Sequence, residues 1–396
     1  MTKSFSRMRV AKFIALPLFL WQGIAWSATE IRPEIIEVEA FGMHLAAALN
    51  DRNAEQVAQL LDLRALGQRA AQSMMSNDRE IEAFVKAFES SAKTSVVDAT
   101  VTMLKRQNGA VKFMKVVRRG SETRPLLRYD FGDMGFDYAE YVLERSAASE
   151  LRATDWYQLT RGQLISKSVS VASKLLIDPN PGFIQSLLGV REFDTSSIKT
   201  LRSVGNLQRA GKYREALDLL DSLPSSLLSV RIFATQRVFL ASMTKDDVVY
   251  RKALAGMAEK FGNDPDAAMM LLDHYYYTGD IDKVLNCISL IEGRVGVDGL
   301  TELLRANILY SKERFAEMLA HAHESVRLEP DRLPPYWLVA LGYIHLNQFD
   351  HAIETYSAIA KRFDYKFTRQ DFAAKPELSD FVASTAFKKW LRPEAH

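Results

Sequence analysis

The chain has 396 residues, a formal net charge of +2, 47% hydrophobic residues and 25% charged residues. A charge so close to neutral provides no field for recruiting nucleic acid or an anionic membrane, and the composition is that of a globular protein rather than a disordered one. The length exceeds the ~250–300 residues at which single hydrophobic cores usually stop growing, so we expect two domains. The single cysteine, Cys287, excludes an intrachain disulfide.

The first 27 residues have the pattern of an export signal. Basic residues lie between positions 3 and 12, an apolar run covers residues 13–21, and Ala25 and Ser27 are small residues at the cleavage-recognition positions. We therefore expect a signal peptide over 1–27 that is cleaved after Ser27, and a periplasmic or secreted mature protein without a stable membrane span. The alternative is an uncleaved segment that anchors the chain in the inner membrane.

Residues 33–107 show helical periodicity, and the pattern changes to that of strands between Gly109 and Gly162. In this second part, β-branched and aromatic residues predict four strands. They cover residues 111–117, 126–131, 136–143 and 151–159, and turn residues at 120–122 predict a hairpin between the first two. We expect an α+β domain over 28–180, in which the preceding helices cover one face of a four-stranded antiparallel sheet.

The order of these elements over residues 31–176 loosely resembles the curved-sheet rolls of the nuclear-transport-factor-2-like and cystatin-like groups. Such rolls often enclose a pocket, so the resemblance implies an alternative function as a small-molecule-binding protein or an enzyme. The side chains that could line such a pocket are aromatic residues on the predicted strands, and such residues more often pack within the sheet than contact a ligand. They are Tyr129, Tyr138, Tyr141, Trp156 and Tyr157.

A sequence dense in turn-forming residues, Asp-Pro-Asn-Pro-Gly at 178–182, separates this region from the rest of the chain. Such a sequence cannot continue a helix, so we place the domain boundary between residues 180 and 181. A short amphipathic helix over 183–188 is expected to dock the two domains. The second domain then covers residues 181–396.

The second domain has a repeat with a period near 34 residues. A small or apolar residue returns after 37, 31, 34 and 34 residues, at Ala216, Ala253, Val284, Met318 and Ala352. A period of this length is typical of solenoids, in which helix pairs stack because no single pair can bury its apolar face alone. The predicted fold class is therefore mainly α, with the α+β domain followed by a solenoid of helix pairs.

This region resembles the tetratricopeptide repeat (TPR) family. The resemblance rests on Gly211, Tyr213 and Ala216 in the first unit and on residues 336–356 in the last unit, where aromatic and alanine positions follow the family register. The bulky residues at positions 284 and 318 depart from the small residue of the family. The resemblance implies a concave groove lined by the first helix of each pair, and we expect a capping helix over 371–390 to close the last pair.

The family register also implies which side chains face this groove. We expect Tyr275 to pack inside its helix pair, and Tyr276 and Tyr277 to lie on the concave side. The binding candidates are Gln208, Arg209, Asp273, Tyr276, Tyr277, Asn307, Tyr310, Trp337 and His345, with Leu201 and Leu341 beside them.

The mixture of aromatic and polar candidates suits capture of a protein or peptide, because tyrosine and tryptophan combine large contact area with a polar tip. The leading functional prediction is therefore an exported protein–protein interaction scaffold. The other interpretation of these tyrosines is that they pack against the N-terminal domain or a neighbouring repeat.

We find no catalytic constellation in the sequence and predict no enzyme activity, no cofactor and no metal site. A stripe of basic residues interleaved with aromatic residues, which nucleic-acid binding would need, is also missing. The identity of the protein or peptide partner is not encoded in any of these patterns.

Overall fold

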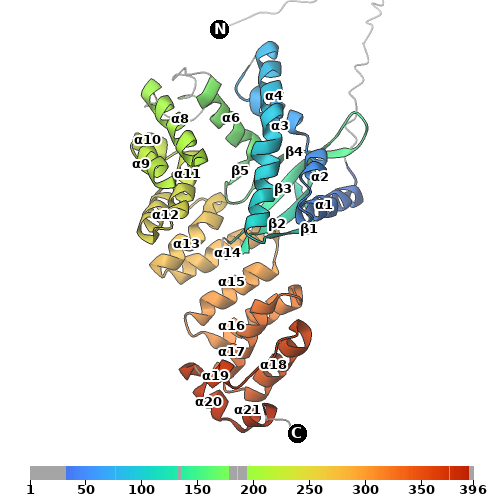
Figure 1. Ribbon diagram of the computed structural model, residues 1–396, viewed down its shortest axis with the longest axis vertical. Coiled ribbons are helices and arrows are strands. Elements are labelled where there is room, and N and C mark those ends of the chain that lie inside the picture. The colour runs from blue at the N-terminus through green and yellow to red at the C-terminus, as the bar shows by residue number, and fades with distance from the viewer. Residues whose placement is uncertain are drawn as a thin grey trace, which may run out of the picture. The chain divides into compact units, whose positions relative to one another are not determined.

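The computed structural model describes residues 33–75, 77–132, 135–177, 185, 194–373 and 375–391, and residues Pro33–His396 form one compact unit (Figure 1). The expected cleavage site after Ser27 and the expected boundary between residues 180 and 181 lie outside the described residues, as does the expected helix over 183–188 except for Gln185. The division into domains 28–180 and 181–396 therefore stays a prediction.

The N-terminal helices begin at residues that cap them. Asn53, Asp62 and Asn77 each accept a backbone N–H of the helix that follows, which satisfies one of its otherwise unpaired donors. These helices are α1 (Ile35–Asn50), α2 (Ala54–Leu60), α3 (Leu63–Gln72), α4 (Asp78–Ala92) and α5 (Ala99–Arg106), with a π-helical segment at Lys93–Asp98.

An antiparallel sheet follows, with its strands in chain order. The strands are β1 (Ala110–Arg119), β2 (Glu122–Asp130), β3 (Phe136–Arg145), β4 (Leu151–Gln158) and β5 (Gln163–Leu164). The four expected strands are present, and the hairpin between the first two turns at Gly120, whose φ of +59° suits glycine. The prediction of a four-stranded sheet is wrong, because β5 adds a fifth strand. With only two residues, β5 is too short to show an alternating pattern.

Both faces of the sheet are covered. On one face, Leu127, Ala139 and Tyr141 pack with residues of α1 and α2 in one hydrophobic cluster. On the other face, Leu126 and Tyr138 belong to the cluster that includes the helices after the sheet. Adjacent strand residues point to opposite faces, so each strand contributes to two cores.

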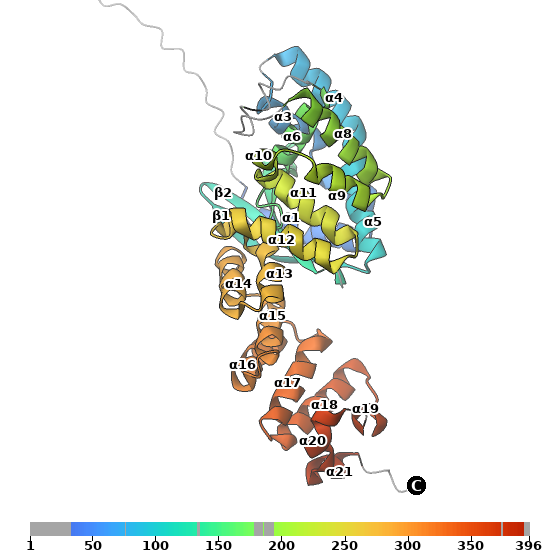
Figure 2. The same cartoon turned by 90° about the vertical axis from the view of Figure 1, so that its left-hand side faces the viewer.

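The chain after the sheet is helical, which confirms the mainly α prediction. The helices α13 to α18 succeed one another in chain order in both Figure 1 and Figure 2. The helices of this part are α6 (Ile165–Ile177), α8 (Thr195–Arg209), α9 (Tyr213–Asp221), α10 (Ser225–Leu228), α11 (Arg231–Met243), α12 (Asp247–Phe261), α13 (Ala268–Thr278), α14 (Ile281–Val295), α15 (Gly299–Tyr310), α16 (Phe315–Leu328), α17 (Leu333–His345) and α18 (Phe349–Phe363).

Short turns join these helices into pairs. Gly279 ends α13 with a φ of +75°, the left-handed conformation that glycine adopts without strain, and α14 starts two residues later. The pairs are α8 with α9, α11 with α12, α13 with α14, α15 with α16, and α17 with α18. The five residues that recur near the 34-residue period all lie on second helices, and all five are buried.

Among the described residues beyond α18 there are three short α-helices, α19 (Gln370–Ala373), α20 (Ser379–Ala383) and α21 (Thr385–Trp390), and a 3-10 helix at Pro376–Leu378. Phe372, Phe381 and Phe387 are buried in one aromatic cluster with Tyr356 of α18. The amphipathic spacing over 371–390 therefore does produce buried aromatic residues, but in separate short helices rather than in one.

Candidate functional site

The predicted groove residues fall into separate groups, each with its own contacts. At the end of α8, Gln208 accepts a hydrogen bond from Nε2 of Gln236 (2.8 Å), and Arg209 binds Asn206 of its own helix. On α15, the Asn307 side chain donates to the carbonyl oxygen of Leu303, one turn earlier (2.9 Å). These polar residues are engaged within the helical array itself.

Tyr310, Trp337 and His345 all take part in ring contacts. The His345 ring stacks on Phe315 with centroids 4.0 Å apart, and the Tyr310 ring lies edge-on to both. Trp337 packs against Tyr356 and against Tyr365 and Phe367, which follow α18. The half-buried indole therefore contributes to the core of this end of the chain. For His345, burial lowers the pKa below its ordinary value, which favours the neutral ring.

The third group forms an exposed aromatic patch on α12 and α13. Tyr275 is buried as expected, whereas Tyr276 and Tyr277 are 53% and 39% exposed. Tyr277 lies edge-on to Tyr276 and to Tyr250 of α12, with centroids 6.2 and 6.3 Å apart. The guanidinium carbon of Arg251 lies 4.4 Å from the centroid of the Tyr277 ring, in cation–π geometry. We call Tyr250, Arg251, Asp273, Tyr276 and Tyr277 the tyrosine patch.

A hydrogen bond fixes one edge of the tyrosine patch. The hydroxyl of Tyr250 donates to Oδ2 of Asp273 (2.7 Å). Burial and the neighbouring carboxylate raise the pKa of Tyr250 far above its usual value, so the phenol keeps its proton and remains a donor. The family register predicted Asp273, Tyr276 and Tyr277, but Tyr250 and Arg251 were missed because they lie on the second helix of the preceding pair.

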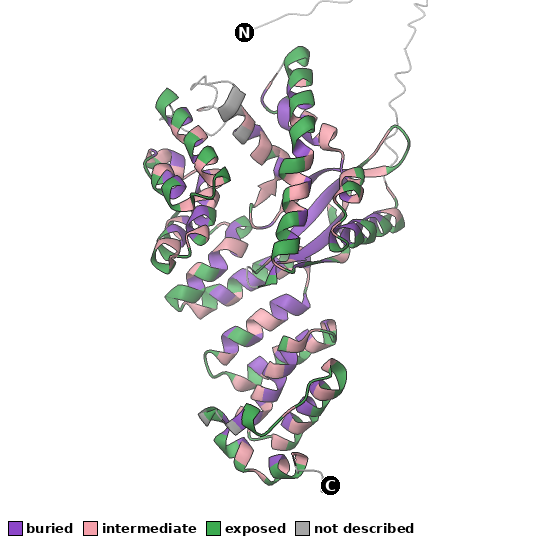
Figure 3. Cartoon of the chain, viewed as in Figure 1, coloured by how far each residue is buried: buried purple, intermediate pink, exposed green. Residues whose placement is uncertain are grey.

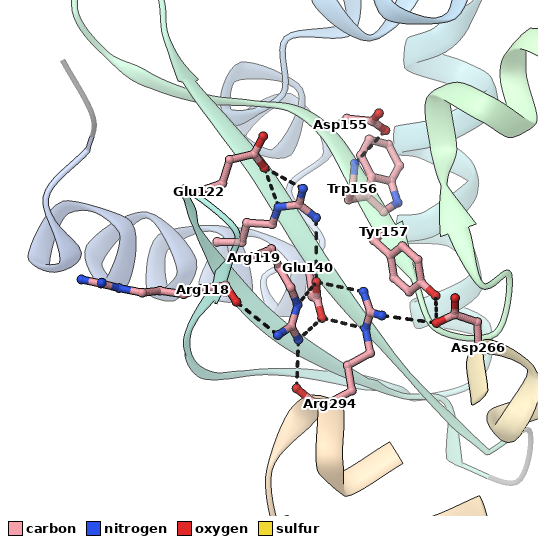
Figure 4. Close-up of polar contacts among 10 residues, drawn as sticks. Arg118, Arg119, Glu122, Glu140, Asp155, Trp156, Tyr157, Asp266 and Arg294 are labelled. Atoms are coloured by element: carbon pink, nitrogen blue, oxygen red, sulfur yellow. Dashed lines mark hydrogen bonds and ion pairs between the residues drawn. The ribbon is translucent and has the colours of Figure 1, made fainter. Parts of the chain in front are cut away.

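A buried ion cluster joins the sheet to the helices after it (Figure 4). Glu140 of β3 is fully buried, and its carboxylate accepts from Nε of Arg119 (2.9 Å) and Nε of Arg294 (2.9 Å). Burial by itself would raise the pKa of Glu140, but the hydrogen bond from Arg119 and the charge of Arg294 lower it below its ordinary value. Arg294 also lies 3.8 Å from the ring centroid of Tyr157, whose hydroxyl donates to Asp266 (2.7 Å).

A second ion cluster lies further along the same face of the sheet. Arg128 of β2 is buried and pairs with Asp298 at the start of α15 and with Glu329 at the end of α16. Tyr138 of β3 donates its hydroxyl to Oδ2 of Asp298 (2.6 Å). Lys112 adds an ion pair to Glu329 (2.8 Å). The contacts between the strands and α15–α16 are thus strongly ionic, and they fix the position of these helices on the sheet.

Three of the aromatic residues that could line a pocket on the strands lie inside the sheet. Tyr129, Tyr138 and Tyr141 are buried in the sheet, and the hydroxyls of Tyr129 and Tyr141 bind each other. A crevice beside Tyr157, Asp266 and Arg294 has a volume of about 20 Å³. This is room for roughly one water molecule, far below the volume of an ordinary ligand pocket.

We also searched the part of the chain that the structure describes for metal sites and for membrane-spanning helices. No group of three or more histidine, cysteine or acidic side chains is arranged to hold a metal ion there. Among these residues, no helix has the length and apolar character needed to cross a bilayer. Comparison with protein-family models gives no match, and comparison with curated proteins gives no significant relative.

Proposed function

We propose that this protein is an exported scaffold that binds a protein or peptide partner through the tyrosine patch of a TPR-like helical array. The observation that carries the proposal is the exposure of Tyr276 and Tyr277 beside the Arg251 cation and the hydrogen bond from Tyr250 to Asp273. Aromatic side chains whose neighbours hold them in place lose little conformational freedom on binding, and tyrosine and arginine are enriched among residues that dominate binding energy.

The helical array supports this proposal. Its five helix pairs place a buried residue near every 34th position, as the stacked pairs of a TPR-like solenoid require. The aromatic residues of α19–α21 pack on α18 in the manner of a capping segment, which a solenoid needs to cover its last apolar face. The export signal over 1–27 would place this scaffold in the periplasm or outside the cell.

The first test compares partner capture by the wild-type protein and by the double variant Tyr276→Ala/Tyr277→Ala. Tagged proteins are crosslinked in their native envelope fraction, and the captured proteins are identified by mass spectrometry. Truncating a residue that dominates an interface costs about 2 kcal/mol or more, so we expect at least a roughly 30-fold loss of partner binding. The fold should survive, because both side chains are exposed.

Tyr365 provides a matched control for this test. It is 38% exposed, as Tyr277 is, but lies beyond α18 and contacts Trp337 and Phe367. Tyr365→Ala should retain the partner. A folded double variant that captures the same partner at wild-type level would show that the tyrosine patch is not the binding site.

A further inference from the structure

Helix α1 has apolar residues on two opposite sides. One side, which includes Val38, Phe41 and Leu45, is buried against the sheet. The other side is exposed, with Ile36 at 75% and Met43 at 51% exposure. Figure 3 shows the exposed parts of the chain in green. A helix that is apolar all round is normally covered all round, so the exposed side of α1 is unusual for the surface of a monomer.

The exposed apolar residues follow one line along the helix. Ile36, Ala40, Met43 and Ala47 are separated by four, three and four residues and are all exposed. This spacing places them on a single stripe, the arrangement by which one helix packs against another. We call these four residues the α1 stripe. Large and small residues alternate along it.

The alternation makes the α1 stripe complementary to itself. If a second copy lies antiparallel about a twofold axis between positions 41 and 42, Ile36 faces Ala47 of the second copy and Ala40 faces its Met43. Every layer then combines one large and one small residue, which packs evenly, whereas a parallel pair would put the two methionines together and the two alanines together. Antiparallel helices also align their dipoles favourably.

Polar side chains of different kinds, a carboxylate and an imidazole, meet at the edge of the α1 stripe in this arrangement. Glu37 and His44 are on the same side of the helix, and the antiparallel register brings Glu37 of one copy close in height to His44 of the other. Glu37 already pairs with Arg145 (2.6 Å), and the hydrogen bond from Arg145 lowers its pKa, so it is ionised near neutral pH. His44 binds Gln56 of α2 on that side (2.6 Å), which holds its ring there.

We propose that the protein forms a homodimer through antiparallel packing of two α1 helices along the α1 stripe. A single helix pair is at the small end of the sizes known for specific interfaces, so association is weak and visible only at high protein concentration. The dimer is independent of the tyrosine patch. It would give each particle two copies of that patch, so that a partner with two binding segments gains from avidity.

Sedimentation velocity over a concentration series tests the dimer with the full-length protein and two variants. We expect reversible dimerisation of the wild type in the micromolar range, and a dissociation constant about tenfold or more higher for Met43→Glu, which would bury a charge between the helices. Val248→Glu is the control, because Val248 is 77% exposed on α12 and lies outside the α1 stripe. Its association should equal that of the wild type.

A wild type that stays monomeric up to about 200 µM would overturn the proposal, since even a weak dimer is populated at that concentration. Equal association of Met43→Glu and the wild type would overturn it as well. If the wild type is monomeric and Met43→Glu unfolds at a lower temperature, the chain's own residues cover the α1 stripe instead.

Engineered cysteines test the register. Residues joined by a disulfide have Cα atoms about 4–7 Å apart, so the antiparallel dimer predicts a disulfide between Ala40→Cys of one copy and Met43→Cys of the other. Mixing the two single variants under oxidising conditions should give mainly the mixed species. If most disulfides instead join two copies of the same variant, the helices pack in parallel, and the antiparallel register is wrong. The native Cys287 does not interfere, because burial raises the pKa of its thiol to about 11.

Discussion

Replacing Asp298 by alanine is expected to lower the free energy of unfolding by roughly 3–5 kcal/mol, the loss found when one partner of a buried ion pair is removed. The carboxylate holds the buried guanidinium of Arg128 and the hydroxyl of Tyr138, and it caps the backbone at the start of α15. Without it, a buried cation loses one of its two carboxylate partners. Urea unfolding followed by circular dichroism measures the loss.

Two variants separate the charge of Asp298 from its capping role. Asp280 caps α14 by accepting the backbone N–H of Lys283, but its side chain is at the surface. Asp280→Ala should therefore cost much less than Asp298→Ala, because it removes only a solvent-exposed cap. Asp298→Asn keeps an effective capping residue and removes the charge. If Asp298→Ala destabilises the protein no more than Asp280→Ala does, the ion pair between Asp298 and Arg128 contributes nothing to stability beyond the cap.

Local patterns in the sequence predicted what depends on neighbours along the chain. The strands were placed to within a few residues, because alternation and turn residues are local signals. The buried positions near the 34-residue period and the burial of Tyr275 beside the exposed Tyr276 and Tyr277 follow from helix geometry in the same way. The two-residue strand β5 gave no such signal. It is defined only by its pairing with β4 after the turn at Gly162.

The ion clusters could not be predicted, because their partners are far apart in the sequence. Arg128 and Glu140 lie on strands where a charged residue normally indicates the solvent face of an antiparallel sheet. Here that face is covered, and the partners that make burial possible are Asp298 and Arg294, more than 150 residues later. The contacts of Trp337 with Tyr365 and Phe367 could not be predicted for a related reason, because they come from a segment without the repeat pattern.

The candidate binding site was predicted in part. The register of the repeats identified Tyr276, Tyr277 and Asp273, which the structure brings together in one patch. It also identified Asn307 and Trp337, whose side chains contact their own helix and the C-terminal aromatic cluster. A register predicts the direction in which a side chain points, but what lies in that direction depends on the stacking of helices that are not consecutive.

The ion cluster around Glu329 is expected to make the protein sensitive to acid. Burial alone would raise the pKa of this carboxyl, but the charge of Arg128 and hydrogen bonds from Lys112 and Arg332 lower it from 4.5 to about 2. A carboxyl whose pKa is lower in the folded state stabilises the protein above its unfolded-state pKa, and this contribution is lost as the pH falls towards the folded-state value. The shift corresponds to at most about 3 kcal/mol, and solvent screening of the exposed Lys112 reduces this value.

Unfolding of the wild type and of Glu329→Gln at a series of pH values isolates this contribution. At pH 7 the variant should be less stable by at most about 3 kcal/mol, and the difference should shrink below about pH 4.5 and vanish near pH 2. Glu324→Gln is the control, since Glu324 pairs with Arg327 at the surface of the same helix. An exposed pair contributes at most about 1 kcal/mol. A difference between the wild type and Glu329→Gln that persists unchanged at pH 2 would mean that glutamine disturbs the packing of α16, and that the charge of Glu329 does not hold this helix on the sheet.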